Sequence, residues 1–191
     1  CGTAKTTTQN WITLEGCKLA LQSDVNYDNG NYSSPPKKGL KAFSRNYTST
    51  LFDKEGYEEG LHLNLFDGFE DTESYLNFMD SFFGSIDAND LLGMLNTWQM
   101  GDIGKHEKFN NNTKKALANI NCPALVMPSS TDLSFPARNN IPEVKEMPNA
   151  ELKVINTKHG HLAGGMSTTL TSQEDVAFID KNIREFLKKI T

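Results

Sequence analysis

Two short apolar segments in the C-terminal part of the chain restrict the fold more than any other feature. Residues 124–127 are apolar throughout and lie between Pro123 and Pro128, a pattern typical of a strand that is buried on both faces. A second strand is predicted at residues 151–156, and a helix is expected between the two at residues 142–147.

The chain closes with an amphipathic segment at residues 175–190 that predicts a helix. Its lysines gather at the C-terminal end, where they suit the helix dipole. We expect its apolar stripe to be buried, namely Val176, Ile179, Ile183, Phe186, Leu187 and Ile190. The order strand, helix, strand, helix predicts an α/β fold class with parallel strands and flanking helices.

The preceding 115 residues predict an α-helical insertion. Helical periodicity is found at residues 10–24 and 39–52, and two further helices are expected within residues 70–100, the second of them opened by the N-cap-like Asp87. Residues 54–70 are acidic and interrupted by glycine, so we expect them to be irregular.

Composition excludes several classes of function. A net charge of -5 and a pI near 5.4 give no electrostatic reason to expect a nucleic-acid partner. No apolar run is long enough for a membrane span, so no membrane partner is expected. The three cysteines, Cys1, Cys17 and Cys122, have no CxxC spacing, which argues against a disulfide framework or a metal site. We therefore expect a cytoplasmic protein without a metal.

Polar residues follow both predicted strands, where the functional side chains of parallel sheets gather. The loop PSSTDLSFP presents Asp132, and the loop TKHGHLAGG presents His159 and His161. Asp132 and His161 are 29 residues apart, which leaves room for one helix and one strand between them. Adjacent strands would therefore bring a carboxylate and an imidazole within hydrogen-bond range.

The acid precedes the base, which is the chain order of α/β-hydrolases, where the nucleophile comes first. In such a site the carboxylate orients the imidazole that takes the nucleophile's proton. Gly160 lets the backbone approach the site closely. The alternative for Asp132 is a turn residue that bonds its own backbone, and His159 is expected to pack or to face solvent.

Four segments resemble the homoserine O-acetyltransferase family of α/β-hydrolases, in order and over nearly the whole chain: CGTAKTTTQN, DANDLLGMLNTWQMGD, NCPALVMPSSTDLSFP and TKHGHLAGG. The resemblance implies a triad of Ser, Asp and His, in which Asp132 matches the acid within S-x-D-x-x-F-P and His161 matches the base within H-G-H. It also implies that the G-x-S-x-G nucleophile segment lies upstream of Cys1, and no such motif occurs in the chain.

The resemblance further implies the organisation of the chain. Residues 1–23 would be a segment of the hydrolase core, residues 24–115 a helical lid, and residues 116–191 the C-terminal core with the acid and base loops. The expected partners are a small ester or alcohol substrate and the N-terminal part of the same hydrolase, and a homodimer is compatible with the family. No bound cofactor is expected, with acetyl-CoA as a candidate acyl donor.

Four residues are predicted to bind substrate: Arg45, Trp98, Gln99 and Leu162. Family members that act on homoserine carry an Asp directly after the base, where Leu162 stands here. Because an ammonium group would lose its charge partner at this position, the sequence favours a less polar acyl acceptor, or water. The alternatives are a solvated helix position for Arg45 and a core position for Trp98.

Three functions remain open at this point. The first is acyl transfer through a Ser-His-Asp triad, as an O-acyltransferase or an esterase, which share an acyl-enzyme and differ in what attacks it. The second is a non-catalytic α/β-hydrolase-like module for binding or assembly. The third is a lipoprotein or interaction domain that begins at Cys1.

Overall fold

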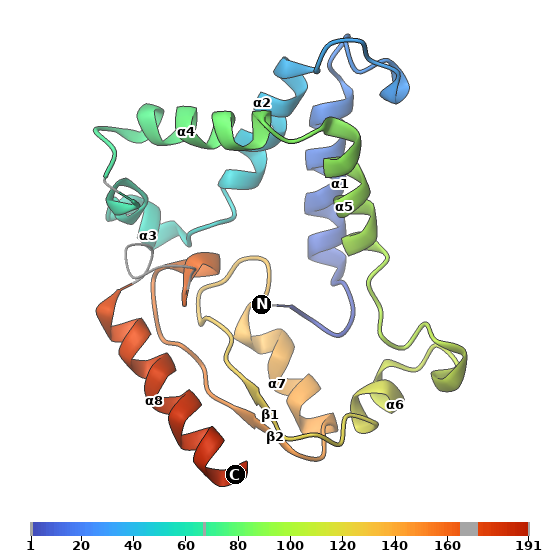
Figure 1. The fold of residues 1–191 in the computed structure, drawn as a ribbon, viewed down its shortest axis with the longest axis vertical. Coiled ribbons are helices and arrows are strands. Elements are labelled where there is room, and N and C mark those ends of the chain that lie inside the picture. The colour runs from blue at the N-terminus through green and yellow to red at the C-terminus, as the bar shows by residue number, and fades with distance from the viewer. Residues whose placement is uncertain (1, 67, 165–171, 191) are drawn as a thin grey trace. The chain divides into compact units, whose positions relative to one another are not determined.

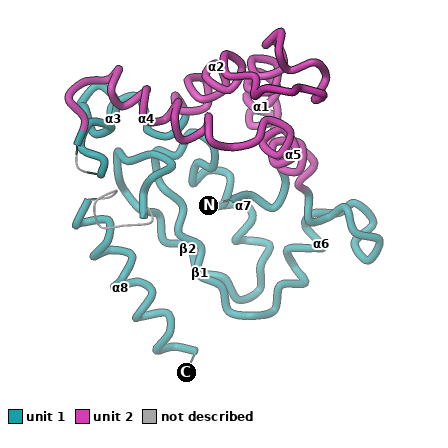
Figure 2. The backbone as a smooth tube through the Cα atoms, turned by 45° about the horizontal axis from the view of Figure 1, so that its top comes forward, with its two compact units in different colours: residues 1–5, 50–68, 102–191 teal, residues 6–49, 69–101 magenta. Residues whose placement is uncertain are grey.

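The computed structural model describes residues 2–66, 68–164 and 172–190 (Figure 1). The chain forms two compact units, each built from segments that are distant in sequence (Figure 2). Unit 1 comprises Cys1–Lys5, Thr50–Gly68 and Asp102–Thr191. Unit 2 comprises Thr6–Ser49 and Phe69–Gly101.

Unit 2 is helical, and each expected helix is present. Its elements are α1 (Thr8–Gln22), the 3₁₀ turn η1 (Asp28–Gly30), α2 (Lys37–Thr48), α4 (Thr72–Gly84) and α5 (Ala88–Gln99). Helix α1 packs against both α2 and α5, and α2 packs against α4. The unit is therefore a helical layer without strands among its described residues.

Side-chain caps explain where the helices of unit 2 begin. The Asp87 carboxylate accepts hydrogen bonds from the backbone N–H groups of Asn89 and Asp90, which confirms the predicted start of α5. Asp71 and Ser74 form a reciprocal capping box at the start of α4. Helix α2 begins two residues before the expected start at Gly39. At position 39 any side chain would collide with the backbone carbonyl of Leu21.

The core of unit 2 contains an aromatic cluster between α2 and α4. The ring of Phe43 lies 5.2 Å from that of Phe83, edge to face, and 5.6 Å from that of Tyr47. Helix α1 contributes its buried face to the same unit, although Trp11, which was expected on that face, is 49% exposed in the first turn of the helix.

Unit 1 carries the α/β part of the chain. Its elements are α3 (Lys54–Glu58), η2 (Leu61–Asn64), η3 (Glu107–Phe109), α6 (Thr113–Ala118), β1 (Ala124–Val126), α7 (Ala137–Glu146), β2 (Ala150–Leu152), η4 (Gly160–Leu162) and α8 (Gln173–Ile190). The expectation of irregular structure at residues 54–70 was wrong, because Asp53 caps a helix there by accepting a hydrogen bond from Gly56.

Strands β1 and β2 pair in parallel, in the register Ala124↔Ala150 to Val126↔Leu152. A parallel bridge between Ser129 and Ile155 continues the pairing beyond Pro128. Both predicted strands are thus present but shorter than expected, and they are half-buried. The expected burial of residues 124–127 on both faces was wrong, because these residues are only half-buried although α7 and α8 flank the pair (Figure 1).

Two helices of unit 1 differ from expectation. Helix α7 begins five residues before Pro142, which the helix accommodates in its interior. The apolar stripe of α8 was expected to be buried, yet Ile183 and Leu187 are 42% and 49% exposed. A stripe is buried only where an element covers it, and the described residues leave the C-terminal half of α8 open.

The aromatic cluster of unit 2 should carry much of its stability. Replacing Phe43, which is 1% exposed, with alanine is expected to lower the free energy of unfolding by about 3–5 kcal/mol, because the ring leaves a cavity. Phe78→Ala on α4 is the control, since its ring is 40% exposed and the loss should be well below half as large. Urea unfolding followed by circular dichroism measures both, and equal losses would contradict the packing described.

Candidate catalytic acid and base

The acid loop follows β1 and holds Asp132 from two sides. Its carboxylate oxygen Oδ1 accepts hydrogen bonds from the backbone N–H groups of Ser134 at 2.8 Å and Phe135 at 2.9 Å. The other oxygen, Oδ2, lies 2.9 Å from Nδ1 of His161. The sequence left two roles open for Asp132, that of a turn residue and that of an acid beside the imidazole. Its contacts fit both, since Oδ1 bonds the backbone of the turn and Oδ2 faces the imidazole.

The electrostatics of the loop keep Asp132 ionised near neutral pH. Burial raises the pKa of Asp132, but the hydrogen bonds from His161 and the two backbone N–H groups outweigh burial and hold that pKa below its ordinary value. Because the pKa is lowered on folding, the stabilisation by this carboxylate is present above its ordinary pKa and is lost as the pH falls through the lowered one.

The base loop presses His161 against a neighbouring segment of unit 1. The backbone N–H of His161 donates to the carbonyl of Leu51 at 2.8 Å. Gly160 adopts a φ of +56°, and a side chain there would lie within 2.9 Å of the backbone of residues 51–53. The predicted close approach at Gly160 is confirmed, and glycine is required for it.

Hydroxyl groups tie the acid loop to the base loop. Thr131 donates through Oγ1 to the carbonyl of Thr157 at 2.8 Å, and Oγ1 of Thr131 accepts from the N–H of Gly160 at 3.3 Å. Ser130 Oγ accepts from the N–H of Thr157 at 3.2 Å. Sequence reasoning missed these residues, although the Ser-Ser-Thr run directly before Asp132 was the available signal.

The geometry assigns different tasks to the two nitrogens of His161. Nδ1 faces the carboxylate of Asp132, so it carries the proton and leaves Nε2 free to accept another. The side chain of His161 is 26% exposed, whereas that of Asp132 is 0% exposed. An oriented imidazole with an open face can take a proton from a nucleophile and return it to a leaving group.

The other predicted site residues are distributed over both units. Leu162 directly follows the base in η4 and is half-buried. Arg45 lies on α2 in unit 2, where its guanidinium pairs with Glu73 at 2.7 Å and Asp80 at 3.0 Å. The structure thus brings Asp132 and His161 together, with Leu162 next to His161 in the chain, and it gives Arg45 carboxylate partners within its own unit.

Gln99 and Trp98 end helix α5 in unit 2. The amide of Gln99 accepts from Lys18 Nζ at 2.9 Å and donates to Glu15 at 2.8 Å, which joins α5 to α1. Trp98 lines a shallow hollow of about 650 Å³ on the surface of α5. Gln99 thus joins two helices of unit 2, and Trp98 lies at a surface hollow of the same unit. The predicted contact of both residues with substrate stays a prediction.

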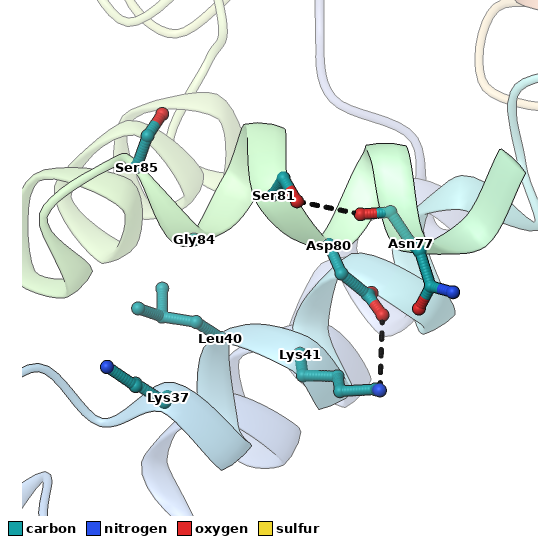
Figure 3. Close-up of a pocket in the computed structure, with 8 residues that line it drawn as sticks. All are labelled: Lys37, Leu40, Lys41, Asn77, Asp80, Ser81, Gly84 and Ser85. Carbon is teal, nitrogen blue, oxygen red and sulfur yellow. Dashed lines mark hydrogen bonds and ion pairs between the residues drawn. The ribbon is translucent and has the colours of Figure 1, made fainter. Parts of the chain in front are cut away.

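A second open hollow of about 560 Å³ lies between α2 and α4 (Figure 3). Lys41 faces Asp80 across it at 3.5 Å. The hollow is lined by Lys37, Leu40, Lys41, Asn77, Asp80, Ser81, Gly84 and Ser85. None of these lining residues belongs to the predicted site.

Among the described residues, no three His, Cys, Asp or Glu side chains converge as metal ligands. None of the described helices combines the length and apolar character that crossing a membrane requires.

The close approach at Gly160 yields a stability prediction. Gly160→Ala should lower the free energy of unfolding by about 1–3 kcal/mol, because the methyl group meets backbone atoms at a positive φ. Gly16→Ala in α1 is the matched control, since nothing lies within 4 Å of the added carbon and helix propensity improves. Urea unfolding compares the two, and a neutral Gly160→Ala would refute the crowding inferred here.

Comparisons with known proteins find relatives that are named esterase, ethyl acetate hydrolase and homoserine O-acetyltransferase. The chain is 32% identical over 190 residues to a probable esterase of Corynebacterium glutamicum, covering 98% of this chain and 52% of that protein. It is 31% identical to an ethyl acetate hydrolase of Pseudomonas veronii, covering 84% of this chain and 46% of the relative. A homoserine O-acetyltransferase of Chloroherpeton thalassium is 26% identical over 77% of this chain and 39% of its own length.

The fold agrees with these relatives. The crystal structure of an acetylester hydrolase from Corynebacterium glutamicum matches with a TM-score of 0.84 and 30% identity, over 98% of this chain and 52% of that one. No family model matches the chain. The chain spans about half the length of the curated relatives it matches. The chain matches the C-terminal portion of proteins of the α/β-hydrolase family, among them acetylester hydrolases and homoserine O-acetyltransferases.

Proposed function

We propose that the enzyme containing this chain cleaves small acyl esters through a Ser-His-Asp triad, with Asp132 as the acid, His161 as the base and a serine upstream of this chain as the nucleophile. The observation that carries the proposal is the 2.9 Å contact between His161 Nδ1 and the buried carboxylate of Asp132. The relatives named esterase and ethyl acetate hydrolase support the same chemistry.

The proposed reaction has two halves that use His161 in the same way. Nε2 takes the serine proton as the serine oxygen attacks the ester carbonyl, and it then gives that proton to the departing alcohol. Water next attacks the acyl-enzyme while Nε2 takes a proton from it, and serine leaves with that proton. Asp132 stabilises the imidazolium that forms in each half.

Water or a neutral alcohol is proposed as the acyl acceptor, because Leu162 follows the base. An apolar side chain at this position offers an ammonium group no charge partner, and it adds favourable contact with an apolar group worth roughly 1.5–3 kcal/mol. The O-acyltransferase alternative, with acetyl-CoA as donor, is supported by the relatives named homoserine O-acetyltransferase. A non-catalytic module is the remaining alternative, and an upstream half without a nucleophilic serine would support it.

The triad proposal is tested in the whole enzyme, which joins this chain to its upstream half. His161→Ala should lower kcat for p-nitrophenyl acetate by about 10⁴- to 10⁶-fold, because the serine loses its proton acceptor. His106→Ala is the matched control, since that histidine caps a 3₁₀ turn of unit 1 and has no part in the proposed proton transfer. The 191-residue chain alone should show no turnover; turnover by it that is abolished by a mutation within it would overturn the proposal.

Acceptor choice is tested at Leu162. Leu162→Asp should raise kcat/KM for homoserine relative to simple alcohols, because a carboxylate beside the base can pair with the ammonium group. Leu162→Asn is the control for shape, since it has nearly the same size without the charge. The measurement uses both acceptor classes with acetyl-CoA as donor. A wild-type enzyme that already prefers homoserine would show that Leu162 does not decide the acceptor.

A further inference from the structure

A second histidine–carboxylate pair lies beside the proposed base. Nδ1 of His159 lies 3.4 Å from Oδ2 of Asp175 in the first turn of α8. Thr157 stands between them: its Oγ1 lies 3.0 Å from His159 Nδ1 and donates to Asp175 Oδ2 at 2.7 Å. Asp175 is 5% exposed, and neither His159 nor Asp175 has a part in the proposed proton transfer.

The hydrogen bonds of the pair point to one tautomer of His159. A threonine hydroxyl has one proton, and here it goes to Asp175. Oγ1 of Thr157 can therefore only accept from the ring of His159, as it also accepts from the backbone N–H of His159 at 3.1 Å. Nδ1 of His159 must then carry a proton and donate it, which makes the ring a fixed bridge from the base loop to α8.

This bridge completes the attachment of the base loop. The acid loop holds the start of the base loop through Thr131 and Thr157, and the segment around Leu51 holds the N–H of His161. His159 supplies the third attachment, to α8, and its ring also lies 6.3 Å from that of Phe52. A single residue, Gly160, separates His159 from His161, so both rings project from the same short turn.

We propose that His159, Thr157 and Asp175 form a positioning network that holds the imidazole of His161 in register with Asp132. The proposal rests on the function proposed above. Asp132 keeps two backbone hydrogen bonds of its own, whereas the ring of His161 is 26% exposed and is placed by its loop, by Asp132 and by the ring of Phe135, which lies 5.7 Å away. A displacement of about 1 Å at a reacting group costs on the order of 10²-fold in rate.

The test uses His159→Ala and His159→Asn in the whole enzyme. The asparagine amide places an N–H donor near the position of Nδ1, so it should preserve the bridge that alanine removes. His159→Ala is expected to lower kcat for p-nitrophenyl acetate by about 10- to 100-fold with KM unchanged, and His159→Asn should restore most of that loss. Thr157→Val, which removes the bridging hydroxyl, should lower kcat in the same way. It is the variant that tests the proposal if His159→Ala does not fold.

A second measurement separates positioning from stability. The ring proton shared by His161 Nδ1 and Asp132 should give a far-downfield proton resonance in the wild type, which broadens or disappears in His159→Ala and persists in His159→Asn. Asn182→Ala is the matched control, because this buried residue of α8 bonds only the carbonyl of Phe178 among the contacts described. It should lower the unfolding midpoint while leaving kcat and the resonance unchanged.

Each outcome decides the proposal. An unchanged kcat in His159→Ala, or an equal loss in Asn182→Ala at an equal unfolding midpoint, overturns the positioning role. A wild-type enzyme without esterase turnover overturns the proposed function instead. In that case the downfield resonance alone decides whether His159 holds His161 against Asp132, since it requires no catalysis.

Discussion

The parallel pairing of β1 and β2 is the constraint on which the candidate site depends. Because the two strands run in the same direction and in register, their carboxyl ends open at one edge, where Ser129 still pairs with Ile155. The acid and base loops therefore start side by side. Asp132 and His161 each lie a few residues beyond this bridge, and hydroxyl bonds between the loops bring them within 2.9 Å.

Burial divides the tasks between acid and base. A carboxylate without solvent requires hydrogen-bond partners, and Asp132 has two from its own loop and one from His161. The acid loop can thus keep its conformation while the imidazole moves a proton. The partly exposed ring of His161 is the member of the pair whose position has to be set by its surroundings, and hydrogen bonds attach its loop to the acid loop, to the carbonyl of Leu51 and to α8.

The sequence predicted the parts of unit 1 that follow from local pattern, namely both strands, Asp132, His161 and the tight backbone at Gly160. It missed the contacts of Thr157, because a loop sequence does not show which distant groups a threonine hydroxyl will contact in the fold. It was wrong about the burial of α8, since a stripe such as that around Leu187 shows what can be buried and not what covers it. Helix α3 was not predicted, because five residues after one capping residue show too little periodicity to indicate a helix.

Two histidines one residue apart, each beside a carboxylate, raise the question of which is the base. His161 donates directly to Asp132 and leaves Nε2 on an open face. His159 shares Asp175 with the hydroxyl of Thr157, so that carboxylate is committed to a bridging network at the start of α8. The Oδ2 atom of Asp132 faces the ring of His161, whereas the Oδ2 atom of Asp175 also accepts a hydrogen bond from Thr157. The two environments therefore support the proposed proton transfer at His161 and the proposed placement by His159.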